Sequence, residues 1–176
     1  MSTTGGRLQG SVYTGDDGSA DPALAAALAG YDAGTTSYPA VLDALAATRV
    51  LVPVVALLGE VEHGDDGLAR DKSSDMAAVL VTGADGRRAL LAFTDVPALE
   101  CWDAQARPVP VSTVLAAQTA VQEGAEALVV DLAGPVRFVV SGTDLRRLAA
   151  GWRPVRAGDG TWAWLGSDRG DSPRPE

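Results

Sequence analysis

"MAAVLVTGADGRRALLAFTDVPALECW", residues 76–102, contains the local patterns on which the predicted fold depends. Residues 76–82 and 87–93 are mainly apolar segments, and the turn-forming sequence Gly-Ala-Asp-Gly separates them. A short glycine-containing connection between two apolar runs is a strong hairpin signal. The sequence therefore predicts two antiparallel strands at this point.

A helix is predicted directly after this hairpin, over residues 96–102. Thr94 and Asp95 precede a Val-Pro pair, and a side-chain oxygen in that position accepts hydrogen bonds from free N–H groups of a first helical turn. A catalytic centre at Thr94, Asp95 and Cys101 is the competing interpretation. Cys101 falls near the C-terminal end of the predicted helix, where the helix dipole disfavours a thiolate. We therefore predict a helix cap at this junction and a buried, structural Cys101.

The other segments extend this pattern of hairpins mixed with helices. Helices are predicted near 21–30, 38–48, 112–124 and 141–151, the last two capped by Ser112 and by Ser141 or Thr143. Strands are predicted over 49–59, 107–111, 128–131 and 136–140. This order favours an α+β sandwich, a mixed or antiparallel sheet with helices packed against it in one compact domain, over a regular strand-helix alternation.

Composition excludes several classes of function. The chain has 176 residues and a net charge of −9, and binding to nucleic-acid phosphates depends on lysine and arginine. No apolar run approaches the roughly 18 residues of a membrane span, and no secretion signal is evident at the start. One cysteine allows no internal disulfide. We predict a cytoplasmic protein that binds neither nucleic acid nor membrane.

The polar segment between residues 60 and 75 is the only candidate for a metal site. It contains six acidic residues and His63 but lacks the spacing of a calcium loop, and a lone histidine offers no pair for a transition metal. The glycine patterns of phosphate-binding loops are also absent. We predict a solvated loop, with no metal and no cofactor.

Tryptophans provide the strongest hint of a binding surface. Trp102, Trp152, Trp162 and Trp164 are four of the nine aromatic residues, and alternation puts Trp162 and Trp164 on one side of an extended segment. A terminal strand that packs these rings on the core is one interpretation. An exposed aromatic patch that anchors a partner is the other. Four nearby arginines, at 146, 147, 153 and 156, are predicted to be ordinary solvated surface.

The order of segments resembles the N-terminal domain of the SseB family over about residues 38–151. The residues that carry the resemblance are "VLVPV" at 50–54, "LLAFTD" at 90–95 and "VPVSTVLAAQTAVQEGAEALVVDLAGP" at 109–135. The family often has an Asn-Pro-Gly type of turn where this chain has Asp-Leu-Ala-Gly-Pro, at 131–135. The resemblance implies a small cytosolic α+β domain with no established catalytic residues, from a family that is named for enhanced serine sensitivity.

The resemblance also suggests an organisation and an origin. We predict a flexible N-terminal arm over 1–22, an SseB-like domain over 23–158, and an aromatic segment with a disordered tail over 159–176. Many family members occur in actinobacteria, and one lysine against thirteen arginines suits such a genome.

Two functions from different classes follow. The first is a non-enzymatic protein-binding or regulatory module, whose partner is another protein or a second copy, with Trp162 and Trp164 as candidate contacts. The alternative is a small-molecule sensor or enzyme of amino-acid metabolism, with a pocket near Phe93, Thr94 and Trp102.

Overall fold

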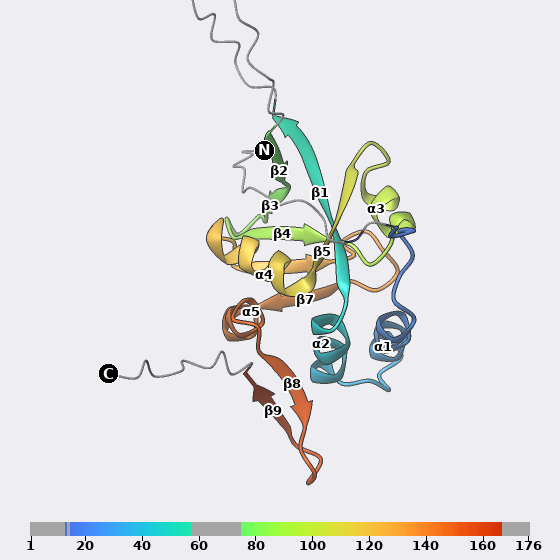
Figure 1. Ribbon diagram of the computed structural model, residues 1–176, viewed down its shortest axis with the longest axis vertical. Coiled ribbons are helices and arrows are strands. Elements are labelled where there is room, and N and C mark those ends of the chain that lie inside the picture. The colour runs from blue at the N-terminus through green and yellow to red at the C-terminus, as the bar shows by residue number, and fades with distance from the viewer. Residues whose placement is uncertain (1–12, 14, 58–74, 167–176) are drawn as a thin grey trace, which may run out of the picture.

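The computed structural model describes residues 13, 15–57 and 75–166, and in these ranges the chain has an α+β fold of five helices and nine strands (Figure 1). The helices are α1 (Pro22–Asp32), α2 (Tyr38–Ala46), α3 (Val96–Trp102), α4 (Thr113–Gln122) and α5 (Gly142–Ala149). The strands are β1 (Arg49–Leu57), β2 (Asp75–Ala78), β3 (Leu80–Thr82), β4 (Arg88–Ala92), β5 (Arg107–Ser112), β6 (Ala127–Val130), β7 (Phe138–Ser141), β8 (Arg153–Arg156) and β9 (Trp162–Leu165). The predicted fold class is confirmed. None of these helices has the length and apolarity that a membrane span requires.

The strands form three sheets, and one pair in the largest sheet is parallel. The strand orders are β2-β1-β5, β3-β4-β6-β7 and β8-β9. All neighbours are antiparallel except β4 and β6. Parallel neighbours need a long crossover, which α3, β5 and α4 supply here. The carboxyl ends of β4 and β6 therefore meet at the same edge of the sheet.

The two larger sheets are joined through Val79, at the boundary between β2 and β3. The Val79 N–H donates to the Pro53 carbonyl of β1 at 3.1 Å, and its own carbonyl accepts from the Leu91 N–H of β4 at 3.3 Å. Leu51 and Phe93 exchange two further backbone hydrogen bonds of 2.8 Å each. The single strand predicted over 76–82 is therefore wrong: the chain changes partner at Val79 and contributes to both sheets.

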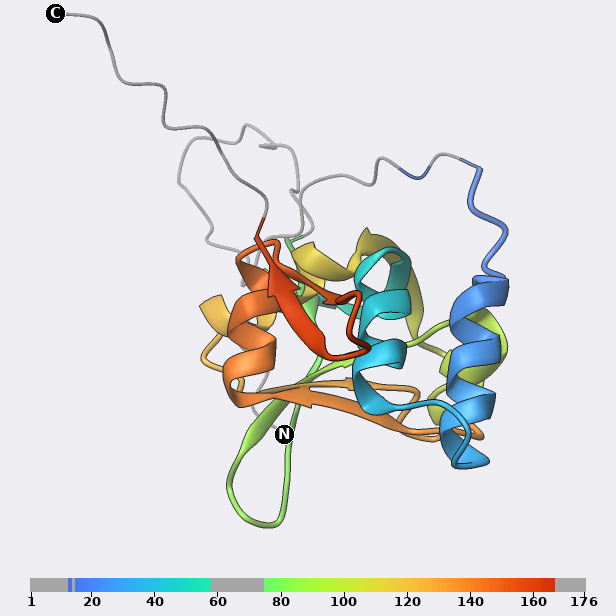
Figure 2. The same ribbon diagram turned by 90° about the horizontal axis from the view of Figure 1, so that it is seen from below.

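The larger core lies between one face of the four-stranded sheet and the helices α2, α4 and α5 (Figure 2). Side chains alternate along a strand, so Leu128 and Val130 of β6 face these helices and are fully buried. Phe138 of β7 joins them and stacks on Tyr38 of α2, with ring centroids 5.0 Å apart. Burial of one such side chain contributes about 1.5–3 kcal/mol to the free energy of unfolding.

The smaller core is formed with α3 on the opposite side of the sheet. Its buried members are Leu51, Leu91, Phe93, Ala98 and Leu99. Phe93 stacks on Trp102 at the end of α3, with centroids 5.7 Å apart. This packing holds the junction of β4 and α3 in place, where the sequence analysis placed its candidate pocket.

Side-chain N-caps are present at three of the five predicted helix starts. Asp21 accepts two hydrogen bonds from the first turn of α1, Asp95 accepts the Ala98 N–H at 2.8 Å, and Ser112 accepts the Leu115 N–H at 3.2 Å. Ser141 occupies the N-cap position of α5 but makes no side-chain cap bond. Thr143 is already inside that helix and accepts from Arg146 instead.

Candidate functional site

A buried polar contact closes the carboxyl ends of β4 and β6. Thr94, which follows β4, donates both its N–H and its hydroxyl to the carboxylate of Asp131, which follows β6, each at 2.8 Å. Both residues are buried, with 6% of Thr94 and 4% of Asp131 exposed. The Asp131 N–H also donates to the Ala92 carbonyl at 3.0 Å. Thr94 is therefore a partner of Asp131, whereas the cap of α3 is Asp95.

Asp131 has two unusual properties. Its backbone φ is 53°, in the left-handed region that aspartate tolerates better than most residues. Burial raises the pKa of its carboxyl above the ordinary value, and the two donors from Thr94 oppose that shift without overcoming it. Both carboxylate oxygens are occupied by Thr94, so this group is a link between two strands rather than a vacant acid or base.

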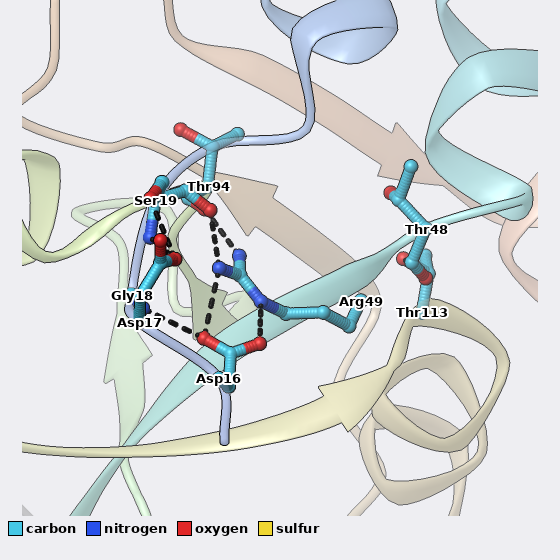
Figure 3. Close-up of polar contacts among 8 residues, drawn as sticks. All are labelled: Asp16, Asp17, Gly18, Ser19, Thr48, Arg49, Thr94 and Thr113. Carbon is cyan, nitrogen blue, oxygen red and sulfur yellow. Dashed lines mark hydrogen bonds and ion pairs between the residues drawn. The ribbon is translucent and has the colours of Figure 1, made fainter. Parts of the chain in front are cut away.

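Residues 16–19, within the predicted flexible arm, lie across this junction (Figure 3). The Arg49 guanidinium donates to the Asp16 carboxylate at 2.6 and 3.0 Å, to the Thr94 carbonyl at 2.5 Å and to the Ser19 carbonyl. The hydrogen bonds from Arg49 to this carboxylate hold the pKa of Asp16 below its ordinary value. The Val96 N–H, at the start of α3, donates to the Gly18 carbonyl at 2.9 Å. The arm segment is therefore fastened over the end of β4.

Gly18 is required at this crossing. Its φ is +77°, and a Cβ atom there would lie 2.5 Å from a methyl carbon of Val96. The segment therefore approaches α3 more closely than a larger residue permits.

Cys101 is exposed, so the prediction of a buried, structural cysteine is wrong. Ala98 and Leu99 form the buried side of α3. Cys101 comes two residues after Leu99 and points to the other side of a helix with about 3.6 residues per turn. His63 and most of the acidic insert lie outside the described residues. Within residues 13, 15–57 and 75–166, no group of acidic, histidine and cysteine side chains has the arrangement of a metal site.

The C-terminal aromatic segment is the second strand of a β-hairpin, the β8–β9 hairpin. β9 carries Trp162 and Trp164, and it pairs with β8, which was not predicted. The register places Pro154 opposite Trp164 and Arg156 opposite Trp162, so these four side chains share one face. Both tryptophans are half-buried. Their burial is therefore intermediate between the two predicted alternatives, packing in the core and an exposed patch.

This face of the hairpin borders a cavity of about 280 Å³ against α2 and α5, which we call the hairpin cavity. Its walls are Tyr38, Pro39, Leu42, Asp144, Arg147, Pro154, Trp162, Ala163 and Trp164. The Arg147 guanidinium lies 5.3 Å from the centroid of the Trp164 ring and 3.8 Å from a carboxylate oxygen of Asp144. Burial raises the pKa of Tyr38 to about 12, and the neighbouring Asp144 carboxylate adds to the shift. The Tyr38 hydroxyl therefore stays protonated at neutral pH.

A second cavity, of about 260 Å³, lies beside Trp102. Its walls are Val54, Val79, Trp102, Asp103, Gln105, Ala106 and Arg107. Phe93 and Thr94 line neither of these two cavities. Of the five predicted site residues, the structure thus brings Trp162 and Trp164 together at one cavity, places Trp102 at another, and buries Phe93 and Thr94.

Comparison with models of protein families identifies the family of this chain. The model of the SseB protein N-terminal domain matches residues 23–147. The chain belongs to the SseB family. The SseB match ends inside α5, so Trp152 and the β8–β9 hairpin lie beyond it. No curated protein and no solved structure matches the chain.

Proposed function

We propose that this SseB-family domain is a non-enzymatic protein-binding or regulatory module, and that the β8–β9 hairpin carries its recognition surface. The polar groups at the junction of β4 and α3 are engaged with one another, as the bonds between Thr94 and Asp131 and around Arg49 illustrate. The hairpin, in contrast, has aromatic and apolar side chains at the surface. A binding role therefore accounts for the described residues better than catalysis does.

The observation that carries this proposal is the exposure of Trp152 and Leu165. Leu165 of β9 is 59% exposed, and Trp152, just before β8, is 41% exposed. The Trp152 ring lies against Gly166, where a Cβ atom would be 3.0 Å from the ring, so Trp152 is on the face of Trp164 and Leu165 is on the opposite face. Exposed tryptophan is typical of the anchors that dominate protein–protein contacts.

The geometry of the hairpin supports the same conclusion. A two-stranded ribbon is marginally stable by itself and needs a layer to pack on. α2 supplies that layer on the face of Trp162 and Trp164 (Figure 2). Leu165 alternates with Trp164 along β9 and so points to the opposite face. A partner that covers this opposite face completes a sandwich around the ribbon.

Affinity capture from a lysate of the native host tests the proposal when matched variants are compared. The wild-type chain is expected to retain one partner in stoichiometric amount, either another protein or a second copy. Leu165→Asp is expected to lose it, because a carboxylate replaces an apolar contact. Val121→Asp changes an equally apolar side chain that is 42% exposed on α4, and it is expected to retain the partner. Equal capture by both variants contradicts a role of the hairpin.

A second candidate function is the small-molecule sensor, and the cavity beside Trp102 supports it. Asp103, Gln105 and Arg107 contribute polar groups to an otherwise apolar cavity there. Thermal-shift screening with amino acids tests this candidate. If the chain is such a sensor, an amino acid is expected to raise the melting temperature of Trp152→Ala but not of Trp102→Ala. A ligand that stabilises both variants equally argues against this cavity.

We also infer a cytoplasmic location and an actinobacterial origin. Support for the location comes from one unpaired cysteine, and support for the origin from thirteen arginines against one lysine. Fractionation of the native host with an antibody against the chain tests the location, and recovery in an extracellular or membrane fraction contradicts it.

A further inference from the structure

The hairpin cavity combines aromatic walls with a few charged groups. It lies where the inner face of the β8–β9 hairpin crosses α2 and α5 (Figure 2). Aromatic rings of Tyr38, Trp162 and Trp164 form much of its wall, and charged groups come from Arg147 and Asp144 of α5. Aromatic walls with a few polar groups are typical of a site that holds a side chain of a ligand.

Hydrogen-bond donors exceed acceptors in these walls. Each tryptophan contributes an indole N–H, which can only donate, and neither indole has a hydrogen-bond partner among the described residues. Arg147 adds a guanidinium whose only ion pair there is the 3.8 Å contact with Asp144. Asp144 is the one carboxylate in the wall. A ligand that satisfies these donors has to bring acceptor oxygens.

The net charge of residues 142–166 also favours a ligand that brings acceptor oxygens. Residues 142–166 contain four arginines and two aspartates, a net charge of +2 in a chain whose total is −9. Arg156 lies opposite Trp162 in the hairpin register, and neither it nor Arg146 has an ion-pair partner in the described part of the chain. Arg147 and Arg156 thus place positive charge beside the two tryptophans, in a chain whose total charge is negative.

We infer that the hairpin cavity docks an acidic segment of a partner protein. A glutamate or aspartate side chain of that segment accepts from Arg147 and the indole N–H groups, and an adjacent apolar side chain packs on Trp162. Charge-assisted hydrogen bonds to a guanidinium are stronger than neutral ones, and a carboxylate matches the planar fork of arginine. This inference rests on the proposed function, because it names the chemistry of the partner that the hairpin binds.

Nucleic acid is the other polyanion that pairs with arginine and stacks on tryptophan. Its affinity depends on neutralising many phosphates along a strand. A net charge of −9 repels a long polyanion, whereas a short acidic segment needs only the local groups. An acidic protein segment is therefore the occupant that these observations favour.

Selection from a phage-displayed library of random dodecapeptides on the immobilised full chain tests the inference. Enriched peptides are expected to carry net negative charge and at least one large apolar residue. The most enriched peptide is then synthesised, and its Kd is measured by calorimetry against the wild-type chain and two charge-reversal variants. Arg156→Glu is expected to weaken binding by about tenfold or more, equivalent to 1.4 kcal/mol per factor of ten. Arg137→Glu, an exposed arginine between β6 and β7, is the matched control and is expected to leave Kd unchanged.

The outcomes separate this inference from the proposed function. Enriched peptides that are neutral or basic, or a Kd that Arg156→Glu leaves unchanged, overturn the acidic segment. Displacement of the peptide by single-stranded DNA of equal length at similar affinity also overturns it, in favour of nucleic acid. Failure to enrich any peptide counts against it as well. The capture experiment with Leu165→Asp decides the proposed function independently, because that side chain is on the opposite face of the hairpin.

Discussion

Removal of the Asp131 carboxylate is expected to destabilise the domain more than its size suggests. Asp131→Ala leaves the N–H and hydroxyl of Thr94 without their acceptor, and Thr94 is only 6% exposed. A buried donor without a partner costs about 1–3 kcal/mol. Alanine at a φ of 53° adds about 1 kcal/mol of backbone strain.

One effect has the opposite sign. Burial raises the pKa of Asp131, so the charged carboxylate is itself held at a cost in the folded state, and its removal recovers part of that cost. We therefore expect a net loss of about 2–3 kcal/mol for Asp131→Ala. Asp131→Asn keeps one acceptor oxygen, tolerates the same backbone conformation and is uncharged, so its expected loss is about 1 kcal/mol or less.

Urea unfolding followed by tryptophan fluorescence measures both values. Asp32→Ala is the control, because Asp32 is an exposed aspartate at the end of α1, and its expected change is within about 0.5 kcal/mol. The reasoning is refuted if Asp131→Ala behaves like the control. It is also refuted if Asp131→Asn is as unstable as Asp131→Ala, because the acceptor then has no role.

Three further predictions concern charge, the N-terminal segment and the thiol. Because burial raises the folded-state pKa of Asp131 above 3.8, the native state holds this proton more tightly than the unfolded chain. The free energy of unfolding then falls as the pH rises from 3.8 through that folded-state pKa. Asp131→Asn is expected to lack this fall, and urea titrations of both proteins across this pH range measure it. Asp16→Asn is expected to weaken the contact with Arg49, lower the free energy of unfolding by about 1–2 kcal/mol and speed hydrogen exchange at the Val96 amide. Unchanged exchange at Val96 contradicts the role of Asp16 in holding residues 16–19 against α3. Cys101 is expected to react stoichiometrically with a thiol reagent in the native protein, and protection until unfolding contradicts its exposure.

Local signals in the sequence were sufficient for most of the fold. Asp21, Asp95 and Ser112 accept hydrogen bonds from the first turns of their helices, as their positions before apolar-periodic segments predict. Gly86, with a φ of 80°, turns the predicted hairpin between β3 and β4. Gly124, with a φ of 66°, follows α4. Each of these features depends on residues a few positions apart, which a local pattern records.

Features that depend on distant partners were not predictable in the same way. Asp131 and Thr94 are 37 positions apart, and Arg49 and Asp16 are 33 apart, so no spacing rule joins them. Val79 interrupts an apolar run that looks continuous, because its N–H and carbonyl find partners on two different strands.

The candidate site was recognised in outline only. The alternation of Trp162 and Trp164 put them on one face, which the register of β8 and β9 confirms. β8 itself gave little signal, because it is four residues long and contains Pro154. The cavity walls from α2 and α5 come from residues more than 100 positions apart, such as Tyr38 and Arg147. The turn residues at 157–160 were the sequence signal for a hairpin, because a turn before β9 requires a preceding strand to pair with it.

The account is tested most directly by the indole N–H signals of the four tryptophans in a ¹H–¹⁵N NMR spectrum, assigned with single Trp→Phe variants. The ligand is the acidic dodecapeptide that the selection enriches most. The account predicts that the signals of Trp162 and Trp164 shift on binding, because both residues line the hairpin cavity, while the signal of Trp102 in the other cavity stays in place. A shift of Trp102 with Trp162 and Trp164 unmoved contradicts recognition by the hairpin.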